Sequence, residues 1–229
     1  MTDPAMGKEK VTGSDAGDTG KSYKKDFWDD ANRQYAAPHS RAQKVARLVN
    51  RIAQGRERDL LDVGCGPAGL RLLLDKNIHY YGIDIAIQRP APNLIQADLV
   101  QNPVQFGGKL FDLVLAQGFF EYMGTHQDAK LAEIRRILKP GGTFVATYVN
   151  FGHRSKHVYW PYSNVQPIGD FRRSVQHQFM IKKSFPTSHN WRHSEPNRSF
   201  IKRSQMNLNV NIPFLSPKLA VEFFFICGT

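Results

Sequence analysis

The stretch that decides the fold is Leu60-Leu61-Asp62-Val63-Gly64-Cys65-Gly66-Pro67-Ala68-Gly69. An apolar run leads directly into three glycines at G-x-G-x-x-G spacing, a pattern typical of a buried strand that turns into a helix. Glycines in such a turn let a ligand approach the backbone, and a helix that begins there presents free N–H groups. The stretch therefore predicts a ligand-binding turn at the carboxyl end of a strand.

Helix and strand patterns alternate on both sides of this turn. Apolar residues at i, i+3, i+4 and i+7 in 45–52 predict a helix that ends at Gly55, and the apolar spacing in 131–138 predicts another, closed by Lys139-Pro140-Gly141-Gly142. A short helix is expected after the glycines, up to about Leu74. Strands are expected at 59–63, 80–85, 94–97, 111–116 and 143–149. Such alternation predicts a parallel, doubly wound sheet.

Beyond Asn150 the periodicity fades for about 25 residues that are dense in aromatic and polar side chains. The last strand candidates are 179–185 and 219–227, which we expect to form a final antiparallel hairpin. The segment 186–218 would lengthen the connection of this hairpin, and the sequence assigns it no role.

Three carboxylates suggest which ligand the glycine turn holds. Asp84 follows Gly64 by twenty positions at the end of the next strand, where a carboxylate can accept hydrogen bonds from a ribose diol. A nicotinamide-dependent dehydrogenase also fits this spacing. However, Asp62 would repel a pyrophosphate, Asp98 is placed to meet an adenine amino group, and Pro67 removes a backbone donor. The combination favours a cationic nucleoside without phosphate.

These segments together resemble the class I S-adenosylmethionine-dependent methyltransferases of small-molecule type. The matching stretches are LDVGCGPAG, YYGIDIA, QADL, FDLVLAQGFFEYM and LAEIRRILKPGGTFVATY, within residues 59–149. The resemblance implies an α/β fold with a Rossmann-like, doubly wound, seven-stranded sheet, mostly parallel with a C-terminal antiparallel strand, and N-terminal lid helices. It also implies S-adenosylmethionine as the methyl donor and S-adenosylhomocysteine as its product.

Carried over to this chain, the resemblance assigns a donor site. Asp84 would hold the ribose, Asp98 with the backbone of Leu99 the adenine, and the glycine turn the methionine part. The donor-binding residues implied are Asp62, Gly64, Cys65, Gly66, Asp84, Ile85, Asp98, Leu99, Ala116 and Gln117.

The acceptor site is expected to cover the ends of the fourth and fifth strands. His153 and His189 are the predicted catalytic bases, because both follow expected strands and histidine titrates near neutral pH. The predicted substrate-binding residues are Tyr35, Phe119, Glu121, Tyr159, Trp160 and Tyr162. The sequence suggests no metal site.

The composition is that of one domain, with 229 residues and a net charge of +11. Residues 1–22 are polar and are predicted to be a disordered tail; 23–229 form the methyltransferase domain, with 23–54 as lid and first helices and 55–229 as core. The last 79 residues carry eleven basic and three acidic side chains, a net +8. This excess is expected to be a solvated basic face.

Two cysteines, Cys65 and Cys227, stand too far apart to form a C-x-x-C pair. Apolar stretches are too short to span a membrane, and the start of the chain has no apolar signal region. We therefore expect a cytoplasmic protein without a membrane partner. The sequence leaves the oligomeric state open.

The predicted reaction is methyl transfer from S-adenosylmethionine to an oxygen of a small metabolite, with a natural product or a sugar as the expected acceptor. One alternative is an RNA ribose or base methyltransferase that uses the pairs Arg172-Arg173, Lys182-Lys183 and Lys202-Arg203. Amino-directed base methylation is not supported, since Ala116-Gln117-Gly118-Phe119 stands where Asn/Asp-Pro-Pro-Tyr would be. Specific nucleic-acid binding is thus not expected. The other alternative is a non-methylating protein that binds S-adenosylmethionine.

Overall fold

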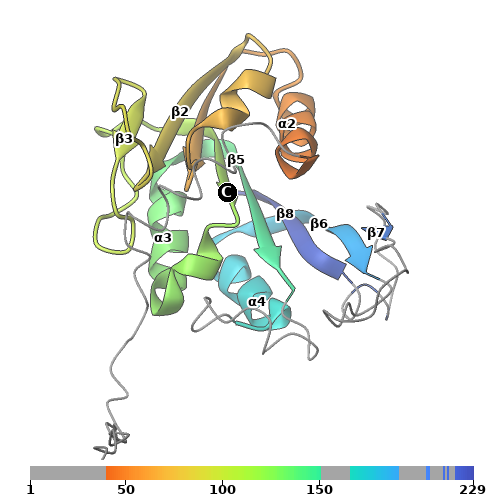
Figure 1. Ribbon diagram of the computed structural model, residues 1–229. Helices are drawn as coiled ribbons and strands as arrows, with labels where there is room; N and C mark the ends of the chain where they lie inside the picture. The colour runs from red at the N-terminus through yellow and green to blue at the C-terminus, as the bar shows by residue number, and fades with distance from the viewer. Residues whose placement is uncertain (1–39, 151–165, 191–204, 207–213, 215, 217–219) are drawn as a thin grey trace, which may run out of the picture.

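The computed structural model describes residues 40–150, 166–190, 205–206, 214, 216 and 220–229. Their strands form one sheet in the order β3-β2-β1-β4-β5-β8-β6-β7 (Figure 1). The strands are β1 (Arg58–Val63), β2 (Ile78–Asp84), β3 (Leu94–Gln96), β4 (Phe111–Gln117), β5 (Leu138–Val149), β6 (Met180–Asn190), β7 (Gln205–Met206) and β8 (Ala220–Gly228).

The mostly parallel sheet that the sequence predicts is confirmed. The pairs among β1 to β5 are all parallel, and β8 lies antiparallel between β5 and β6. Seven of the strands correspond to the expected sheet. The eighth is the two-residue β7, which pairs with the end of β6 and which the sequence did not predict.

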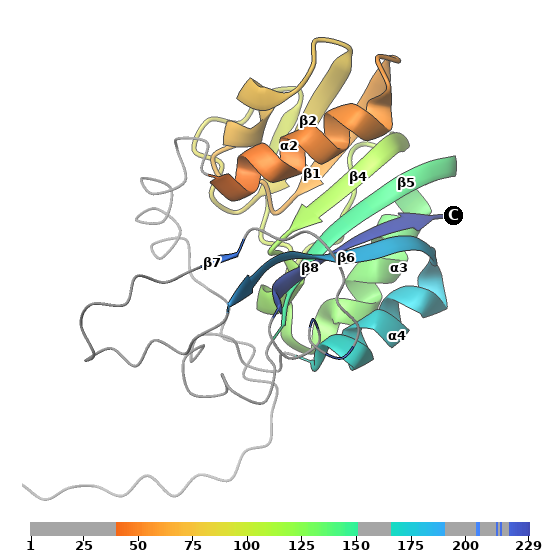
Figure 2. The ribbon, with the colours of Figure 1, turned by 90° about the vertical axis from the view of Figure 1, so that its right-hand side faces the viewer.

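Helices cover both faces of the sheet, as a doubly wound fold requires. Figure 2 shows α2 (Ser40–Ala53) on one face and α3 (Gln127–Ile137) with α4 (Ile168–Gln178) on the other. Three short 3₁₀ helices lie in the connections: η1 (Gly69–Leu73), η2 (Phe120–Tyr122) and η3 (Gly124–His126). None of the described helices combines the length and the apolar character needed to cross a membrane.

The helix α2 packs one apolar stripe against the sheet. Val45, Val49 and Ala53 recur every four residues and are at most 1% exposed. They share a core cluster with Leu60 of β1 and Leu115 of β4. This packing holds the first residues of α2 near the carboxyl ends of the central strands.

The opposite face is built around aromatic rings. Phe171 and Val175 of α4 are fully buried in the same cluster as Leu131 and Ile134 of α3. The helix α4 was missed in the sequence because its buried residues form only one i, i+4 pair, which is too short a pattern to show a helical period.

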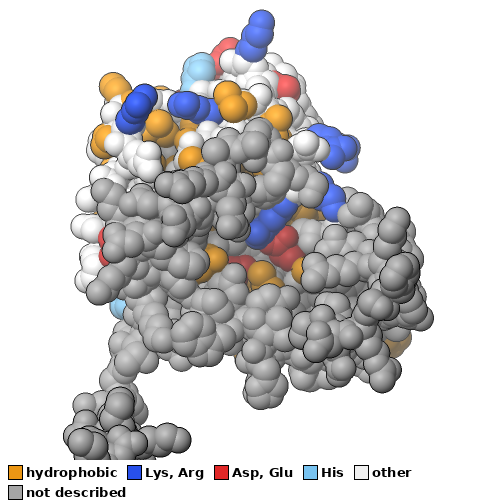
Figure 3. All heavy atoms as spheres, in the orientation of Figure 1, with side chains coloured by type: hydrophobic (Ala, Val, Ile, Leu, Met, Phe, Trp, Pro, Cys, Tyr) orange, Lys and Arg blue, Asp and Glu red, His pale blue; other side chains and the backbone are white. Residues whose placement is uncertain are grey.

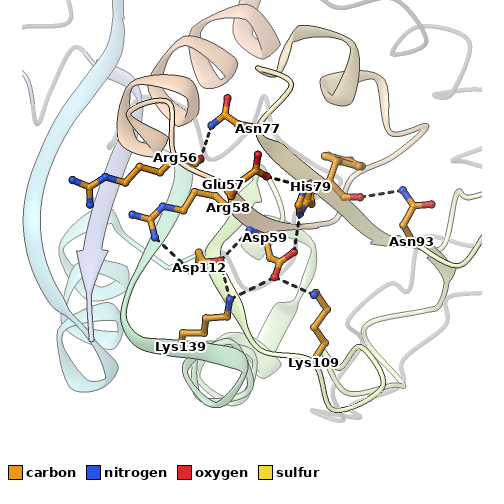
Figure 4. Close-up of polar contacts among 11 residues, drawn as sticks. Arg56, Glu57, Arg58, Asp59, Asn77, His79, Asn93, Lys109, Asp112 and Lys139 are labelled. Atoms are coloured by element: carbon orange, nitrogen blue, oxygen red, sulfur yellow. Dashed lines mark hydrogen bonds and ion pairs between the residues drawn. The ribbon is translucent and has the colours of Figure 1, made fainter.

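A network of charged side chains closes the amino-terminal edge of the sheet, as Figure 4 shows. Lys139 Nζ lies 2.9 Å from Asp112 Oδ2, and Lys109 Nζ lies 3.0 Å from Asp59 Oδ2. Burial acts to raise the pKa of Asp112, but the hydrogen bond from Lys139, with Arg58 and a backbone N–H group, lowers it overall. Charge pairing therefore occupies the edge opposite the glycine turn.

Candidate active site

The order of the strands places a crevice-forming switch point between β1 and β4, because the chain winds away from this point in both directions. Ligands of open α/β sheets bind outside the carboxyl ends of the strands at such a point. Here Val63 pairs with Ile83 and Ala116, and Asp84 pairs with Gln96. The ends of β1, β2, β3 and β4 thus lie along one edge.

The glycine turn follows β1 and is tied to the end of β2. Gly64 and Gly66 have φ angles of 74° and 55°, in the left-handed region that side chains disfavour. Asp84 accepts hydrogen bonds from the backbone N–H groups of Gly66 at 2.9 Å and Ala86 at 2.6 Å. One carboxylate therefore organises the turn and the residues that follow β2.

Asp62 lies beneath this turn and is only 3% exposed. The hydroxyl of Tyr80 donates to Asp62 Oδ2 at 2.9 Å. Burial raises the pKa of Asp62 to about 7, the hydrogen bond from Tyr80 opposes the shift, and the charge of Asp84 adds to it. The carboxyl of Asp62 therefore changes its charge near neutral pH.

The predicted adenine residues stand after β3. Asp98 Oδ1 accepts from the backbone N–H of Val100 at 2.9 Å, and Leu99 is 5% exposed. Ile85, at the end of β2, accepts at its carbonyl from the side chain of Gln96 at 3.0 Å. These residues fit an adenosyl group chemically, because they place carboxylates and apolar side chains near Gly66, where the space that a Cβ atom would take is open.

The two cysteines carry no nucleophilic thiolate. Burial raises the pKa of the Cys65 thiol well above its usual range and that of Cys227 to about 12. Both thiols are therefore protonated at neutral pH.

A second polar group, which the sequence did not reveal, lies at the ends of β4, β5 and β8. Arg41, near the start of α2, forms an ion pair with Glu222 and donates to Thr147 Oγ1 at 3.0 Å. The same Thr147 oxygen accepts from the backbone N–H of Gly118 at 2.9 Å. Gly118 has a φ angle of 58°, in the left-handed region that side chains disfavour, so this position favours glycine.

Glu121 of η2 lies beside this ion pair and is 2% exposed. Its Oε1 accepts from the backbone N–H of Val149 at 2.9 Å, while its Oε2 has no hydrogen-bond partner among the described residues. Burial raises the pKa of Glu121 to about 7; the charge of Arg41 lowers it and that of Glu222 raises it. Figure 3 shows acidic and basic side chains next to one another in a recess near the middle of the molecule.

Phe119 joins the two halves of the site. Its ring is buried and lies against Gly64, with Cδ2 3.0 Å from the place where a Cβ atom of that glycine would stand. It also packs edge-on against Phe120, with ring centroids 5.1 Å apart. Gln117, the last residue of β4, is half-buried next to it. Phe119 therefore forms a buried apolar contact between the glycine turn and the start of η2.

The expectation that His189 follows the sixth strand is wrong. The strand β6 continues to Asn190, because its last residues pair with β8 and β7. The predicted residues Tyr35, His153, Tyr159, Trp160 and Tyr162 lie outside the described residues.

One signal in the sequence points to Glu222, which is a single carboxylate within the apolar run 221–227. A charge buried in a strand requires a partner, but the sequence does not name Arg41 as that partner. In the described part of the chain, no three His, Cys, Asp or Glu side chains are grouped so that they could hold a metal ion.

A family model described as a methyltransferase domain matches residues 37–193. No curated protein matches the chain. Among solved structures, the putative methyltransferase in complex with the Haloferax volcanii Trm112 methyltransferase activator is 16% identical with a TM-score of 0.58, covering 89% of this chain and 94% of that one.

Two further solved structures have a similar fold. The Burkholderia thailandensis 1,6-didemethyltoxoflavin-N1-methyltransferase is 13% identical with a TM-score of 0.57, and the alignment covers 89% of this chain and 84% of that one. The N-methyltransferase NodS from Bradyrhizobium japonicum, solved with S-adenosylhomocysteine, is 13% identical with a TM-score of 0.55 over 86% and 90%. At these identities the likeness concerns the fold.

Proposed function

Since the chain belongs to the methyltransferase-domain family and is an S-adenosylmethionine-dependent methyltransferase, we propose that it methylates an oxygen of a small metabolite. The observation that carries this proposal is the acidic character of the acceptor side. Glu121 and Glu222 are both almost fully buried there, with Arg41 as the neighbouring cation.

Two buried carboxylates beside one guanidinium do not suit a polyanion. A nucleic-acid strand brings a negative charge at every nucleotide, and proteins meet it with clustered Lys and Arg. A neutral hydroxyl compound is not repelled by the buried carboxylates, and it can donate a hydrogen bond to one of them. The site therefore favours a small, uncharged acceptor.

The residues of the chain would hold the donor as the resemblance implies. Asp84 would accept from the ribose hydroxyls and Asp98 from the adenine amino group, while Asp62 would face the methionine amino group. When bound, S-adenosylmethionine supplies a methyl group on a positively charged sulfur. The task of the protein is to hold an acceptor oxygen about 3 to 3.5 Å from that carbon, which by itself removes much of the barrier.

The rival proposal, an RNA methyltransferase, depends on the basic C-terminal pairs. Arg172 donates to Ser184 at 3.1 Å and lies over the ring of Phe225, and Arg173 pairs with Asp170. Lys183 lies over the ring of Phe185. Within the described residues, three of these basic side chains therefore have partners in the chain itself, which does not favour an RNA-binding surface; Lys202 and Arg203 lie outside the described residues.

Incubation of a metabolite extract with methyl-labelled donor, followed by accurate-mass analysis, tests the proposal. We expect label on the hydroxyl of a small molecule with wild-type protein and none with Asp84→Ala, which serves as the matched donor-site control. Calorimetry should show binding of S-adenosylhomocysteine and none of NAD. Label in RNA, with a sequence-specific complex that persists at physiological salt, would instead establish the rival.

A further inference from the structure

Only one of the two carboxylate oxygens of Glu121 forms a hydrogen bond among the described residues. Oε1 ties η2 to the end of β5 through the backbone N–H of Val149, whereas Oε2 is buried without a hydrogen-bond partner among the described residues. Leaving a buried carboxylate oxygen unpaired costs free energy, so such atoms in native proteins call for an explanation. Here the atom belongs to η2, which follows β4, and the other oxygen of the same carboxylate is bonded at the end of β5.

We propose that Oε2 of Glu121 accepts the proton that the acceptor hydroxyl loses, so that this site selects acceptors that are un-ionised alcohols or phenols. This inference rests on the proposed function and specifies its acceptor. It gives Glu121 the role of general base that the sequence assigned to histidines.

The step balances with the donor and acceptor alone. The acceptor oxygen forms a bond to the methyl carbon of the donor, while the carbon–sulfur bond breaks and its electron pair remains on sulfur. The hydroxyl proton passes to Glu121 Oε2 and later leaves to solvent. The acceptor thus becomes a neutral methyl ether, and the positive charge of the sulfur ends as the released proton.

The charges around Glu121 suit this task. Arg41 of α2 and Glu222 of β8 act on it in opposite directions. Burial raises the pKa of Tyr148 of β5, and the charge of Glu121 adds to that shift. With burial as the largest cause, the pKa of Glu121 stands at about 7. A base that titrates near the working pH can both take up and release a proton.

Arg41, Glu222 and Thr147 are positioning residues in this scheme. The ion pair connects the start of α2 to β8, and Thr147 connects Arg41 to the backbone of Gly118. Together they hold the segment after β4 against the end of β5. Glu121 is therefore held from both sides, with Oε2 as its free atom among the described residues.

The first test needs no acceptor. Infrared difference spectroscopy on the full-length protein between acidic and alkaline pH measures the band of protonated carboxylic acids. We expect one component to disappear as pH rises through about 7, to be missing in Glu121→Gln, and to persist in Asp62→Asn, since Asp62 also titrates there. Identical spectra for wild type and Glu121→Gln would overturn the proposal.

The second test uses the labelled-donor assay with the same metabolite extract. Glu121→Gln keeps an amide oxygen for the N–H of Val149, so the fold should be retained. We expect it to slow transfer to the hydroxyl about 10²- to 10⁴-fold and to abolish the fall of kcat/KM below pH 7. Its affinity for S-adenosylhomocysteine should match that of wild type.

The outcomes separate the two claims. Transfer to a hydroxyl by Glu121→Gln within about tenfold of the wild-type rate would overturn the role of Glu121 and leave the proposed function intact. Label found only on nitrogen or in RNA would overturn both the proposed function and the acceptor class inferred here.

Discussion

Asp84 has two tasks at the level of single residues. Each of its oxygens accepts one backbone hydrogen bond, from Gly66 and from Ala86, and each keeps a second lone pair. The side chain can therefore hold the glycine turn and still accept from a ribose hydroxyl. Burial raises its pKa, and the two backbone hydrogen bonds oppose that shift.

We predict that Asp84→Ala weakens binding of S-adenosylhomocysteine by about 2 to 3 kcal/mol, the scale of losing charge-assisted hydrogen bonds to a diol. Calorimetric titration measures this loss. Asp128→Ala, at an exposed position in the first turn of α3, is the matched control and should bind as wild type does. Unchanged affinity in Asp84→Ala would mean that another residue holds the ribose.

Among the elements, α4 depends most on tertiary contacts. Its Phe171 ring stacks on Tyr148 of β5 with centroids 3.8 Å apart and an interplanar angle of 6°, and neither side chain is exposed. The Tyr148 hydroxyl also accepts from the backbone N–H of Gln166, which precedes the helix. This stack and this hydrogen bond attach α4 to β5, and the edge-on contact of Phe171 with Phe225 and the hydrogen bond from Arg172 to Ser184 attach it to β8 and β6.

Phe171→Ala should accordingly lower the free energy of unfolding by about 3 to 5 kcal/mol, through lost burial and the cavity that remains. Urea denaturation followed by circular dichroism gives the value. Leu72→Ala removes a side chain that is 69% exposed and should change stability by no more than about 0.5 kcal/mol. A loss below about 1 kcal/mol for Phe171→Ala would show that the stack does not anchor the helix.

At the scale of the whole molecule, the pKa values of carboxyl groups shift in opposite directions at the two edges of the sheet. At the amino-terminal edge, cations pair with Asp112 and lower its pKa overall. At the carboxyl edge, burial raises the pKa values of Asp62 and Glu121 to about 7. Several ion pairs therefore lie at the amino-terminal edge, whereas the carboxyl edge holds one ion pair, Arg41–Glu222, together with carboxyl groups whose pKa values are raised.

This distribution predicts how stability depends on pH. Between about pH 4 and 7 the folded protein binds more protons at Asp62 and Glu121 than the unfolded chain does, so the free energy of unfolding falls as pH rises through this window. The lowered pKa of Asp112 has the opposite effect on the free energy of unfolding. Its stabilising contribution is present at neutral pH and is lost at acidic pH, as the carboxylate becomes protonated.

Calorimetric Tm values of the donor-free protein from pH 4.5 to 8 measure the trend. The double variant Asp62→Asn with Glu121→Gln should show a flatter profile, because neither amide titrates. An equally steep decline in the double variant would assign the pH dependence to other groups.

The local patterns of the sequence were sufficient for the glycine turn and for most of the sheet, and the donor-binding residues that they indicate stay a prediction. Apolar runs and glycine spacing are read over a few residues, so β1, the turn and the acids after β2 and β3 followed from neighbours along the chain. Parallel strands then bring their carboxyl ends together without further information. The strand β7 and the helix α4 lacked such a pattern.

For the acceptor half, the sequence named Phe119 and Glu121 as substrate-binding candidates, but only the tertiary structure supplied their partners. Arg41 and Glu222 are 181 positions apart in the sequence, and Glu121 and Val149 are 28 positions apart. A pattern within a few neighbouring residues therefore cannot predict either contact. The pKa of a carboxyl depends on what buries it and which charges lie near it, and only the folded chain supplies both. For this reason the sequence alone favoured histidines as bases, whereas the burial and partners of Glu121 in the folded chain are what led us to propose it as the base.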